Sequence, residues 1–297
     1  MSSESCPLCG SVQHQPLFVE RGHTLVACAG CELLFITPYP RQAEEVYSVV
    51  KDYHYDELEI LNVARHYATA QRFYTEYYPR VRPDLIQASS MLDIGCGTGR
   101  LLELAGEFPQ LRRVGLELNA DRAPHARRVA KCEVVEMPLE KYRPEQPFDA
   151  ITMINVFSHV PNINEVFTAL RQLLSPQGKL ILGVGEFSPK VRKDAIYDWQ
   201  IPDHLQFLGM GTTEFLARKH GMKIVRRERI PLAFEMFSRG LLSAPGRSGF
   251  RNLIKKTILY TPGAVALMRS LYRWRHHDSV YSSVIVLQRD DAPSAGK

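Results

Sequence analysis

Residues 91–99, which read Met-Leu-Asp-Ile-Gly-Cys-Gly-Thr-Gly, constrain the fold of this chain more than any other stretch. The apolar run predicts a buried strand, the alternating glycines a tight turn, and the next five residues the start of a helix. Such a turn lets a ligand lie against bare backbone at a helix N-terminus, where N–H groups point outward. A dinucleotide-binding turn needs G-x-G-x-x-G, whereas here the third glycine comes one residue early and Arg100 occupies its place. The spacing therefore favours a nucleoside over NAD, although a plain strand-to-helix turn can have the same spacing.

Strand-like and helical segments alternate along the rest of the chain. Segments typical of helices fall at about 121–130 and 162–174. Runs typical of buried strands fall at 91–94, 113–118, 132–137, 148–156, 179–184, 222–227 and 279–287. The alternation predicts an α/β fold, a Rossmann-like seven-stranded sheet with helices on both faces. Ligands of such sheets bind outside the carboxyl ends of the strands, where the glycine turn, Glu117, Asn155 and Glu186 all fall.

Two C-x-x-C pairs lie near the N-terminus, Cys6 with Cys9 and Cys28 with Cys31. Eighteen residues separate Cys9 from Cys28, a spacing typical of a four-thiolate zinc ribbon. Four thiolates complete a closed tetrahedral shell with no position for water, so we expect a structural Zn²⁺. The alternative is a set of redox-active or unligated thiols. The first residues carry no secretory signal, and no window approaches the ~18 apolar residues of a spanning helix, so we expect a cytoplasmic protein.

The segment between the ribbon and the glycine turn is rich in tyrosine. Helices are expected near 41–50 and over 56–78, and the second carries Tyr67, Tyr74, Tyr77 and Tyr78. Such a helix either covers a ligand as a lid or packs on the core, and the sequence does not decide between the two.

A basic insertion separates the last two expected strands. From Met236 to His277 the chain has no Asp or Glu and eight Lys or Arg residues, while the rest of the chain has 29 basic and 32 acidic residues. Apolar side chains recur at helical spacing, among them Leu267, Leu271 and Trp274. A basic amphipathic helix with a tryptophan favours an anionic membrane surface, here through 239–275, with peripheral attachment. A cap over the substrate pocket, a dimer contact and nucleic-acid binding are the alternatives.

Four motifs in order resemble those of the class I S-adenosylmethionine-dependent methyltransferases. They are 92–99 (Leu-Asp-Ile-Gly-Cys-Gly-Thr-Gly), Glu117, 148–151 (Phe-Asp-Ala-Ile) and 176–180 (Pro-Gln-Gly-Lys-Leu). The resemblance covers about 85–230. The front end, with its ribbon, the Thr-Pro-Tyr-Pro turn at 37–40 and the tyrosine-rich helix, resembles a branch in which a zinc ribbon precedes the methyltransferase domain. Several members of that branch methylate sugars or other small metabolites.

The resemblance implies S-adenosylmethionine as methyl donor. Residues 95–99 would hold its methionine part, Glu117 its ribose, and Met137 and Leu139 its adenine. The implied cofactor-binding residues are Asp93, Gly95, Cys96, Gly97, Gly99, Glu117, Leu118, Met137, Leu139 and Asn155. The stretch 155–160 would line the reaction site, where Ser158 replaces the acid that many relatives have before the histidine.

Methyl transfer to a hydroxyl or an acidic carbon needs a general base, and histidine titrates near neutrality. The candidates are His159, which alternatively has a structural role, and His204 in a Pro-Asp-His-Leu segment that resembles an element of the same branch. We expect methylation of an O or C acceptor on a small molecule, such as a sugar or a lipid-linked metabolite. An RNA methyltransferase and a non-catalytic S-adenosylmethionine-binding protein are the alternatives. The acceptor atom and the oligomeric state stay open.

The expected domain organisation has four parts. They are a zinc-ribbon module at 1–40, a helical lid or linker at 41–84, a methyltransferase domain at 85–289 that contains the basic helical insertion at 231–278, and a disordered tail at 290–297.

Overall fold

The structure is a computed structural model that describes residues 4–40, 59–196, 199–231, 261, 263–276 and 279–291. The helix expected at 41–50, most of the basic insertion and residues 292–297 of the tail lie outside the described residues.

The N-terminal module is a small antiparallel sheet around the four cysteines. Its strands are β1 (His14–Glu20), β2 (His23–Cys28) and β3 (Leu34–Thr37). β2 pairs with both neighbours, and Cys28 and Cys31 frame the turn between β2 and β3. The first C-x-x-C pair precedes β1, so the sheet brings the two pairs together.

The α/β body has eight strands and six described α-helices. The strands are β4 (Ser90–Ile94), β5 (Arg112–Leu116), β6 (Glu133–Val135), β7 (Phe148–Ile154), β8 (Leu174–Phe187), β9 (Gln206–Gly209), β10 (Met222–Pro231) and β11 (Val280–Arg289). The helices are α2 (Glu59–Leu85), α3 (Arg100–Leu104), α4 (Arg122–Ala130), α5 (Ile163–Leu173), α6 (Thr212–Lys219) and α9 (Ala264–His276). Short 3₁₀ turns are η1 (Ala105–Glu107), η2 (Leu139–Lys141), η3 (Phe157–His159) and η4 (Lys193–Ala195).

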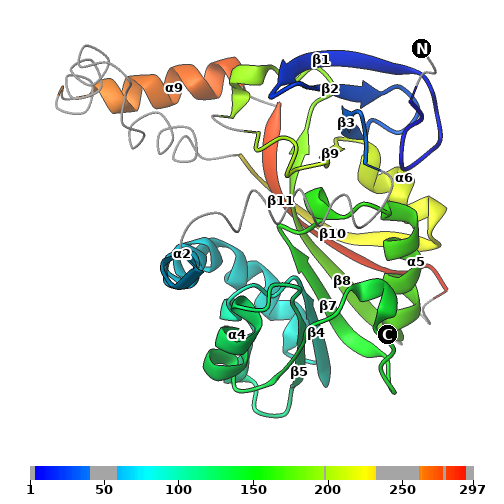
Figure 1. The fold of residues 1–297 in the computed structure, drawn as a ribbon, viewed down its shortest axis with the longest axis vertical. Helices are drawn as coiled ribbons and strands as arrows, with labels where there is room; N and C mark the ends of the chain where they lie inside the picture. The colour runs from blue at the N-terminus through cyan, green and yellow to red at the C-terminus, as the bar shows by residue number, and fades with distance from the viewer. Residues whose placement is uncertain are drawn as a thin grey trace.

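The strand order confirms a Rossmann-like sheet. β6, β5, β4, β7 and β8 are parallel neighbours, β11 lies antiparallel against β8, and β10 lies antiparallel against β11 (Figure 1). The predicted count of seven strands is too low, because the described residues form one sheet of eleven strands, which includes the three ribbon strands and β9. The count omits β9, a four-residue strand too short to show a periodicity, which runs parallel to the end of β8 and pairs with β3. The ribbon is therefore continuous with the main sheet.

Alternating side chains on the central strands form two cores, one on each face of the sheet. Met91 and Ile181 join the core beneath α2, α3 and α4, whereas their neighbours Leu92 and Leu182 join the core that contains α5, α6 and the ribbon. Each fully buried side chain of this size stabilises the fold by roughly 1.5–3 kcal/mol. Tyr74 and Tyr77 of α2 are buried, which fits packing on the core, one of the two roles considered for this helix. Both faces are thus covered, which leaves the ends of the strands as the place for a ligand.

α9 is the described part of the basic insertion and extends from the body beside β1 (Figure 1). No helix among the described residues combines the length and the apolar character that crossing a bilayer requires.

Candidate active site and cysteine centre

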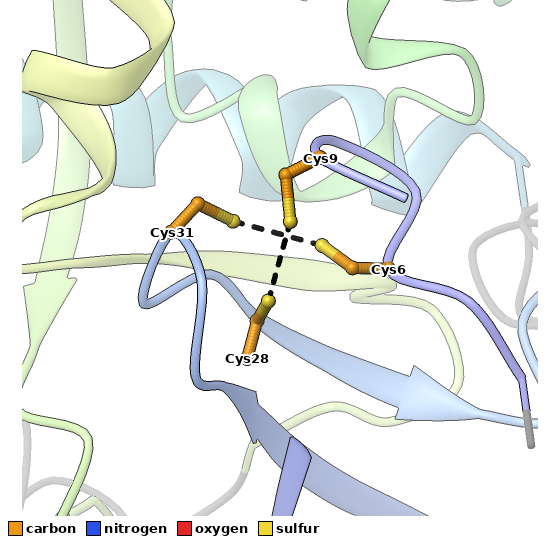
Figure 2. A group of neighbouring side chains, drawn as sticks. All are labelled: Cys6, Cys9, Cys28 and Cys31. Carbon is orange, nitrogen blue, oxygen red and sulfur yellow. Dashed lines mark hydrogen bonds between the residues drawn. The ribbon is translucent and has the colours of Figure 1, made fainter. Parts of the chain in front are cut away.

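The four ribbon cysteines point toward a common centre (Figure 2). Their Sγ atoms all lie within 4.8 Å of one another, with Cys6 Sγ 3.6 Å from Cys31 Sγ and Cys9 Sγ 3.4 Å from Cys28 Sγ. Both separations are far longer than a disulfide bond of about 2.05 Å and close to the ~3.8 Å between thiolates on a tetrahedral Zn²⁺. The cluster is therefore compatible with zinc.

Hydrogen bonds and burial act on the cysteines in opposite senses. The hydrogen bond with Cys31 lowers the pKa of Cys6 to about 5, whereas burial raises the pKa of Cys28 to about 11, and the hydrogen bond with Cys6 together with burial raises the pKa of Cys31. The backbone N–H of Gly30 donates to Cys28 Sγ at 3.3 Å. Since a metal binds the thiolate and not the thiol, a bound cation would be needed to hold all four cysteines deprotonated.

The glycine turn begins where β4 ends. Gly95 has a φ of 64°, and a Cβ there would lie 2.5 Å from Val156 Cγ2. Gly99 has a φ of 83°, and a Cβ there would meet the backbone of Ala126 in α4 at 2.8 Å. Both positions require glycine, because an L side chain would be strained by its φ and blocked by its neighbour. The turn thus brings α3 and α4 close and leaves its backbone bare.

Glu117 follows β5 and faces the glycine turn. Its Oε2 accepts a hydrogen bond from Gly97 N at 2.7 Å, and its Oε1 accepts one from Asn119 N at 2.9 Å. The side chain is 8% exposed. Each carboxylate oxygen has a second acceptor position, so two donors from a ligand can still bind. The geometry fits the ribose role expected for this residue.

Asp93 lies buried directly before the turn. Burial, more than the nearby Glu117 charge, raises its pKa to about 7, although a hydrogen bond that Thr152 Oγ1 donates to Oδ1 at 2.7 Å acts in the opposite sense. Its Oδ2 has no hydrogen-bond partner among the described residues. A buried acceptor without a partner is costly, and the ammonium group of a methionine moiety would satisfy it.

A cavity of about 590 Å³ lies along the carboxyl ends of β4, β5 and β7. Five of the expected cofactor residues line it, namely Gly95, Glu117, Leu118, Met137 and Leu139. His159 and Val160 line it as well. Other lining residues were not assigned from the sequence, namely Asn119, Arg122, Pro138, Glu140 and Lys141. Their positions beside Glu117 and Leu139 in the chain were the signal that could have identified them. We call this space the donor cavity.

A second cavity of about 190 Å³ lies beyond the end of β7 and is lined by two further predicted residues, Asn155 and His204. Its aromatic lining consists of Phe73, Tyr77, Phe157, Phe187 and Phe207. Its polar lining consists of Asn155, Ser158, Gln200, His204, Gln206 and Ser282. We call this space the aromatic cavity.

One histidine lies in each cavity. The ring centroids of His159 and His204 are 4.8 Å apart, and the ring planes are inclined at 64°. His159 Nδ1 donates to the backbone oxygen of Asp203 at 3.1 Å, and His204 Nδ1 donates to that of Trp199 at 3.0 Å. Because a carbonyl oxygen only accepts, both Nδ1 atoms carry a proton, and each Nε2 presents a lone pair when the ring is neutral.

Asp203, buried beside this pair, was not assigned from the sequence. Its Oδ1 lies 3.4 Å from His159 Nδ1. The group of His159, Asp203 and His204 has ligand atoms within 4.8 Å of one another, but the Nδ1 contacts to carbonyl oxygens suit proton transfer better than metal coordination.

Four expected cofactor residues, Asp93, Cys96, Gly97 and Gly99, are not among those that line either cavity, and neither is Glu186. Cys96 is buried with its Sγ against Gly115, where a Cβ would meet it at 2.7 Å, so only its backbone faces the turn. Glu186 is fully buried and accepts two hydrogen bonds from Arg229, at 2.9 and 3.2 Å. Trp199 is fully buried and packs against Phe18, Phe187 and Phe207. The last two therefore act in the core and do not line the acceptor space.

Comparisons with known proteins agree with this site. The model of the family described as "Methyltransferase domain" matches residues 65–226. The ubiquinone biosynthesis O-methyltransferase of Xanthomonas oryzae pv. oryzae is 32% identical over 124 residues, which are 38% of this chain and 49% of that protein. The protein of the same name from Xanthomonas axonopodis pv. citri is 32% identical over 111 residues, 33% of this chain and 44% of that protein. The chain thus spans about half the length of the curated relatives it matches.

Solved structures share the fold at low sequence identity. A geranyl diphosphate C-methyltransferase from Streptomyces coelicolor A3(2), in complex with Mg²⁺, geranyl diphosphate and S-adenosyl-L-homocysteine, has a TM-score of 0.54 and 14% identity, and covers 79% of this chain and 85% of its own. A structure from Galdieria sulphuraria that is assigned as a sarcosine dimethylglycine methyltransferase has a TM-score of 0.52 and 14% identity, and covers 74% of this chain and 85% of its own.

Proposed function

We propose that this chain, which belongs to the class I S-adenosylmethionine-dependent methyltransferases, transfers a methyl group to a hydroxyl oxygen of a small apolar acceptor. One observation carries the proposal. A histidine from the donor cavity and a histidine from the aromatic cavity meet at 4.8 Å, so donor and acceptor spaces adjoin at a pair of proton-accepting groups.

The donor cavity would hold S-adenosylmethionine through groups whose positions the backbone fixes. Glu117 would accept the ribose hydroxyls, and the unpartnered Oδ2 of Asp93 would accept the ammonium of the methionine part. Met137 and Leu139 would flank the adenine. S-adenosylmethionine supplies an already activated methyl group, so the protein needs mainly to align the acceptor with it.

His204 would act as general base from the aromatic cavity. The acceptor oxygen forms a bond to the methyl carbon while the carbon–sulfur bond breaks, its electron pair stays on sulfur, and the hydroxyl proton passes to His204 Nε2. The hydrogen bond from Nδ1 to the backbone oxygen of Trp199 fixes the ring and, in the neutral imidazole, places the lone pair on Nε2. His159, beside Asp203, is the second candidate for the same role.

The acceptor class follows from the lining of the aromatic cavity. Five aromatic side chains suit a planar or apolar group, and Asn155, Ser158 and Gln200 offer hydrogen bonds to hydroxyls. The matching relatives from Xanthomonas are O-methyltransferases of ubiquinone biosynthesis. We therefore favour a lipid-linked hydroxylated acceptor over a free sugar. The ribbon would hold a structural Zn²⁺ outside the reaction.

A release assay tests the proposal. The full chain is incubated with S-adenosylmethionine and, in turn, a prenylated catechol, catechol, a nucleotide sugar and bulk RNA, and S-adenosylhomocysteine is quantified. Turnover of the prenylated catechol with an O-methyl product by NMR is the expected result. Turnover of RNA alone, C-methylation alone, or no calorimetric heat with millimolar S-adenosylmethionine would overturn it.

A second proposal concerns location: α9 would dock on an anionic lipid surface. Leu267, Leu271 and Trp274 lie on one face of α9 and are 61%, 54% and 78% exposed. The basic stretch around them contains no acid, and at the end of α9 Arg275 pairs with Asp194 beside Arg192, whose side chain is 66% exposed. An exposed apolar stripe within a cationic segment is complementary to anionic headgroups above an acyl layer. Such attachment would suit a lipid-linked acceptor.

Tryptophan fluorescence tests the docking. The chain has two tryptophans, and Trp199 is fully buried, so a spectral shift on adding vesicles reports Trp274. We expect a blue shift with phosphatidylserine-containing vesicles and not with phosphatidylcholine alone. In sedimentation, Leu271→Ser should bind about tenfold more weakly, whereas Ile86→Ser, an exposed apolar residue outside α9, should bind as wild type. Absence of binding, equal binding to both vesicles, or self-association that Leu271→Ser abolishes would overturn it.

A further inference from the structure

The ribbon is fastened to the α/β body by more than its strand pairing. Phe35 of β3 pairs with Gln206 of β9, and Ile36 N donates to Leu205 O at 3.0 Å. On the other side of the cysteines, Thr212 Oγ1 donates to Cys31 O at 2.9 Å. These contacts bring the connector after β3 to the segment that carries His204.

Tyr39 lies in that connector and orients the side chain of Gln206. Its hydroxyl donates to Gln206 Oε1 at 2.5 Å, with Pro161 O as a second, longer acceptor at 3.0 Å, and the Tyr39 and Gln206 side chains are buried. Burial raises the pKa of Tyr39, so the hydroxyl stays a donor. Gln206 Nε2 then donates to Phe157 O at 2.6 Å and to Val160 O at 2.7 Å. All hydrogens of the amide are used, and a flipped amide would place its oxygen against two carbonyl oxygens.

The two carbonyl groups that Gln206 holds are on either side of His159. The turn between them, η3, is held further by Leu205 N, which donates to Ser158 O at 2.8 Å. His159 itself contacts Asp203. A short 3₁₀ turn has few internal hydrogen bonds, so its position depends on these outside donors.

We infer that Tyr39 is a positioning residue for His159: through Gln206 it fixes the turn that presents this histidine to the donor cavity, and so makes the ribbon part of the reaction site. The functional meaning rests on the proposed methyl transfer. The geometry also assigns the ribbon a role that a purely stabilising module would not have, because its connector sets the orientation of the His159 side chain in the donor cavity.

Hydrogen exchange and NMR on Tyr39→Phe test the inference without an activity assay. The change removes one hydroxyl. We expect the amides of 157–160 to exchange about tenfold faster, and the imidazole nitrogens of His159 to lose their single-tautomer pattern. Tyr78→Phe, which removes a hydroxyl bonded to Leu104 O at 3.0 Å, is the matched control and should leave both signals unchanged. Wild-type exchange and wild-type His159 signals in Tyr39→Phe would overturn the inference.

A second variant, Gln206→Met, distinguishes loss of this chain of contacts from a general loosening of the ribbon. It keeps Tyr39 and removes the amide, so it should loosen 157–160 to the same degree while exchange of β1 to β3 stays as in wild type. The double variant should be no looser than either single variant, because both break one chain of contacts. An unchanged turn in Gln206→Met, or additive effects, would overturn the inference. A failed release assay would leave these results standing, so the two proposals fail separately.

Discussion

The donor cavity and the aromatic cavity adjoin, yet they are built in different ways. The donor cavity takes most of its lining from short contiguous segments at 94–95, 116–122 and 137–141, each following a strand of the parallel sheet. The aromatic cavity gathers one to three residues each from α2, the segment after β7, β8, the segment before β9, β9 and β11, separated by up to 209 positions between Phe73 and Ser282. Local backbone geometry determines the first space, whereas tertiary packing determines the second.

Replacing His204 should give the largest difference between an effect on turnover and an effect on cofactor binding. His204→Asn should reduce kcat by about 10²–10⁴ with an acceptor from the release assay, because the general base is lost. Affinity for S-adenosylhomocysteine, measured by calorimetry, should change less than twofold. His220→Asn, a histidine outside both cavities, is the control. If His204→Asn keeps wild-type kcat, His159 becomes the base.

Glu117→Ala should give the reverse pattern. Loss of two charge-assisted hydrogen bonds to the ribose should weaken S-adenosylhomocysteine binding by roughly 100-fold. Glu140→Ala, at the rim of the same cavity, should bind within a factor of about two of wild type. Calorimetry with both variants decides, and unchanged affinity in Glu117→Ala would refute the ribose role.

Loss of the proposed ribbon metal should loosen the packing around the aromatic cavity before that around the donor cavity, since Tyr39 and β9 lie on that side. A strong chelator should lower Tm by about 5–10 °C in scanning fluorimetry, because metal binding is coupled to folding of the ribbon. Metal analysis of the purified chain should give one zinc per molecule. A metal-free protein with an unchanged Tm on chelation would contradict the zinc assignment.

The smallest expected effect is the release of a proton from Asp93 when the donor cavity is filled. With its pKa raised to about 7, Asp93 is half protonated at pH 7 in the free protein. A bound ammonium favours the carboxylate, so binding at pH 7 should release about half a proton and at pH 9 none from this group. Calorimetry of S-adenosylhomocysteine in phosphate and Tris measures the release. Asp93→Asn should abolish it, and proton uptake by the wild type would contradict the assignment.

The same contrast explains what could be predicted from the sequence. The strand, glycine turn and helix at 90–104 and the acid at 117 were readable, because alternation and glycine spacing act over a few residues. Likewise, the spacing of the two C-x-x-C pairs was sufficient to predict the cysteine cluster. β9 and the roles of Tyr39, Asp203 and Gln206 were not readable, since each depends on a partner far along the chain. The cofactor roles of all ten residues expected to bind the methyl donor stay predictions, as do the catalytic roles of His159 and His204.

The pairing of β3 with β9 also bears on how the chain folds as it is made. Leu34 and Phe35 meet Phe207 and Gln206, so the ribbon gains its place in the sheet only after some 170 further residues have left the ribosome. Until then its sheet has an open edge at β3, a surface that other strands can pair with. With zinc in the cysteine cluster, as proposed, early metal loading would keep the module compact, and zinc supply during synthesis would then affect yield as well as stability.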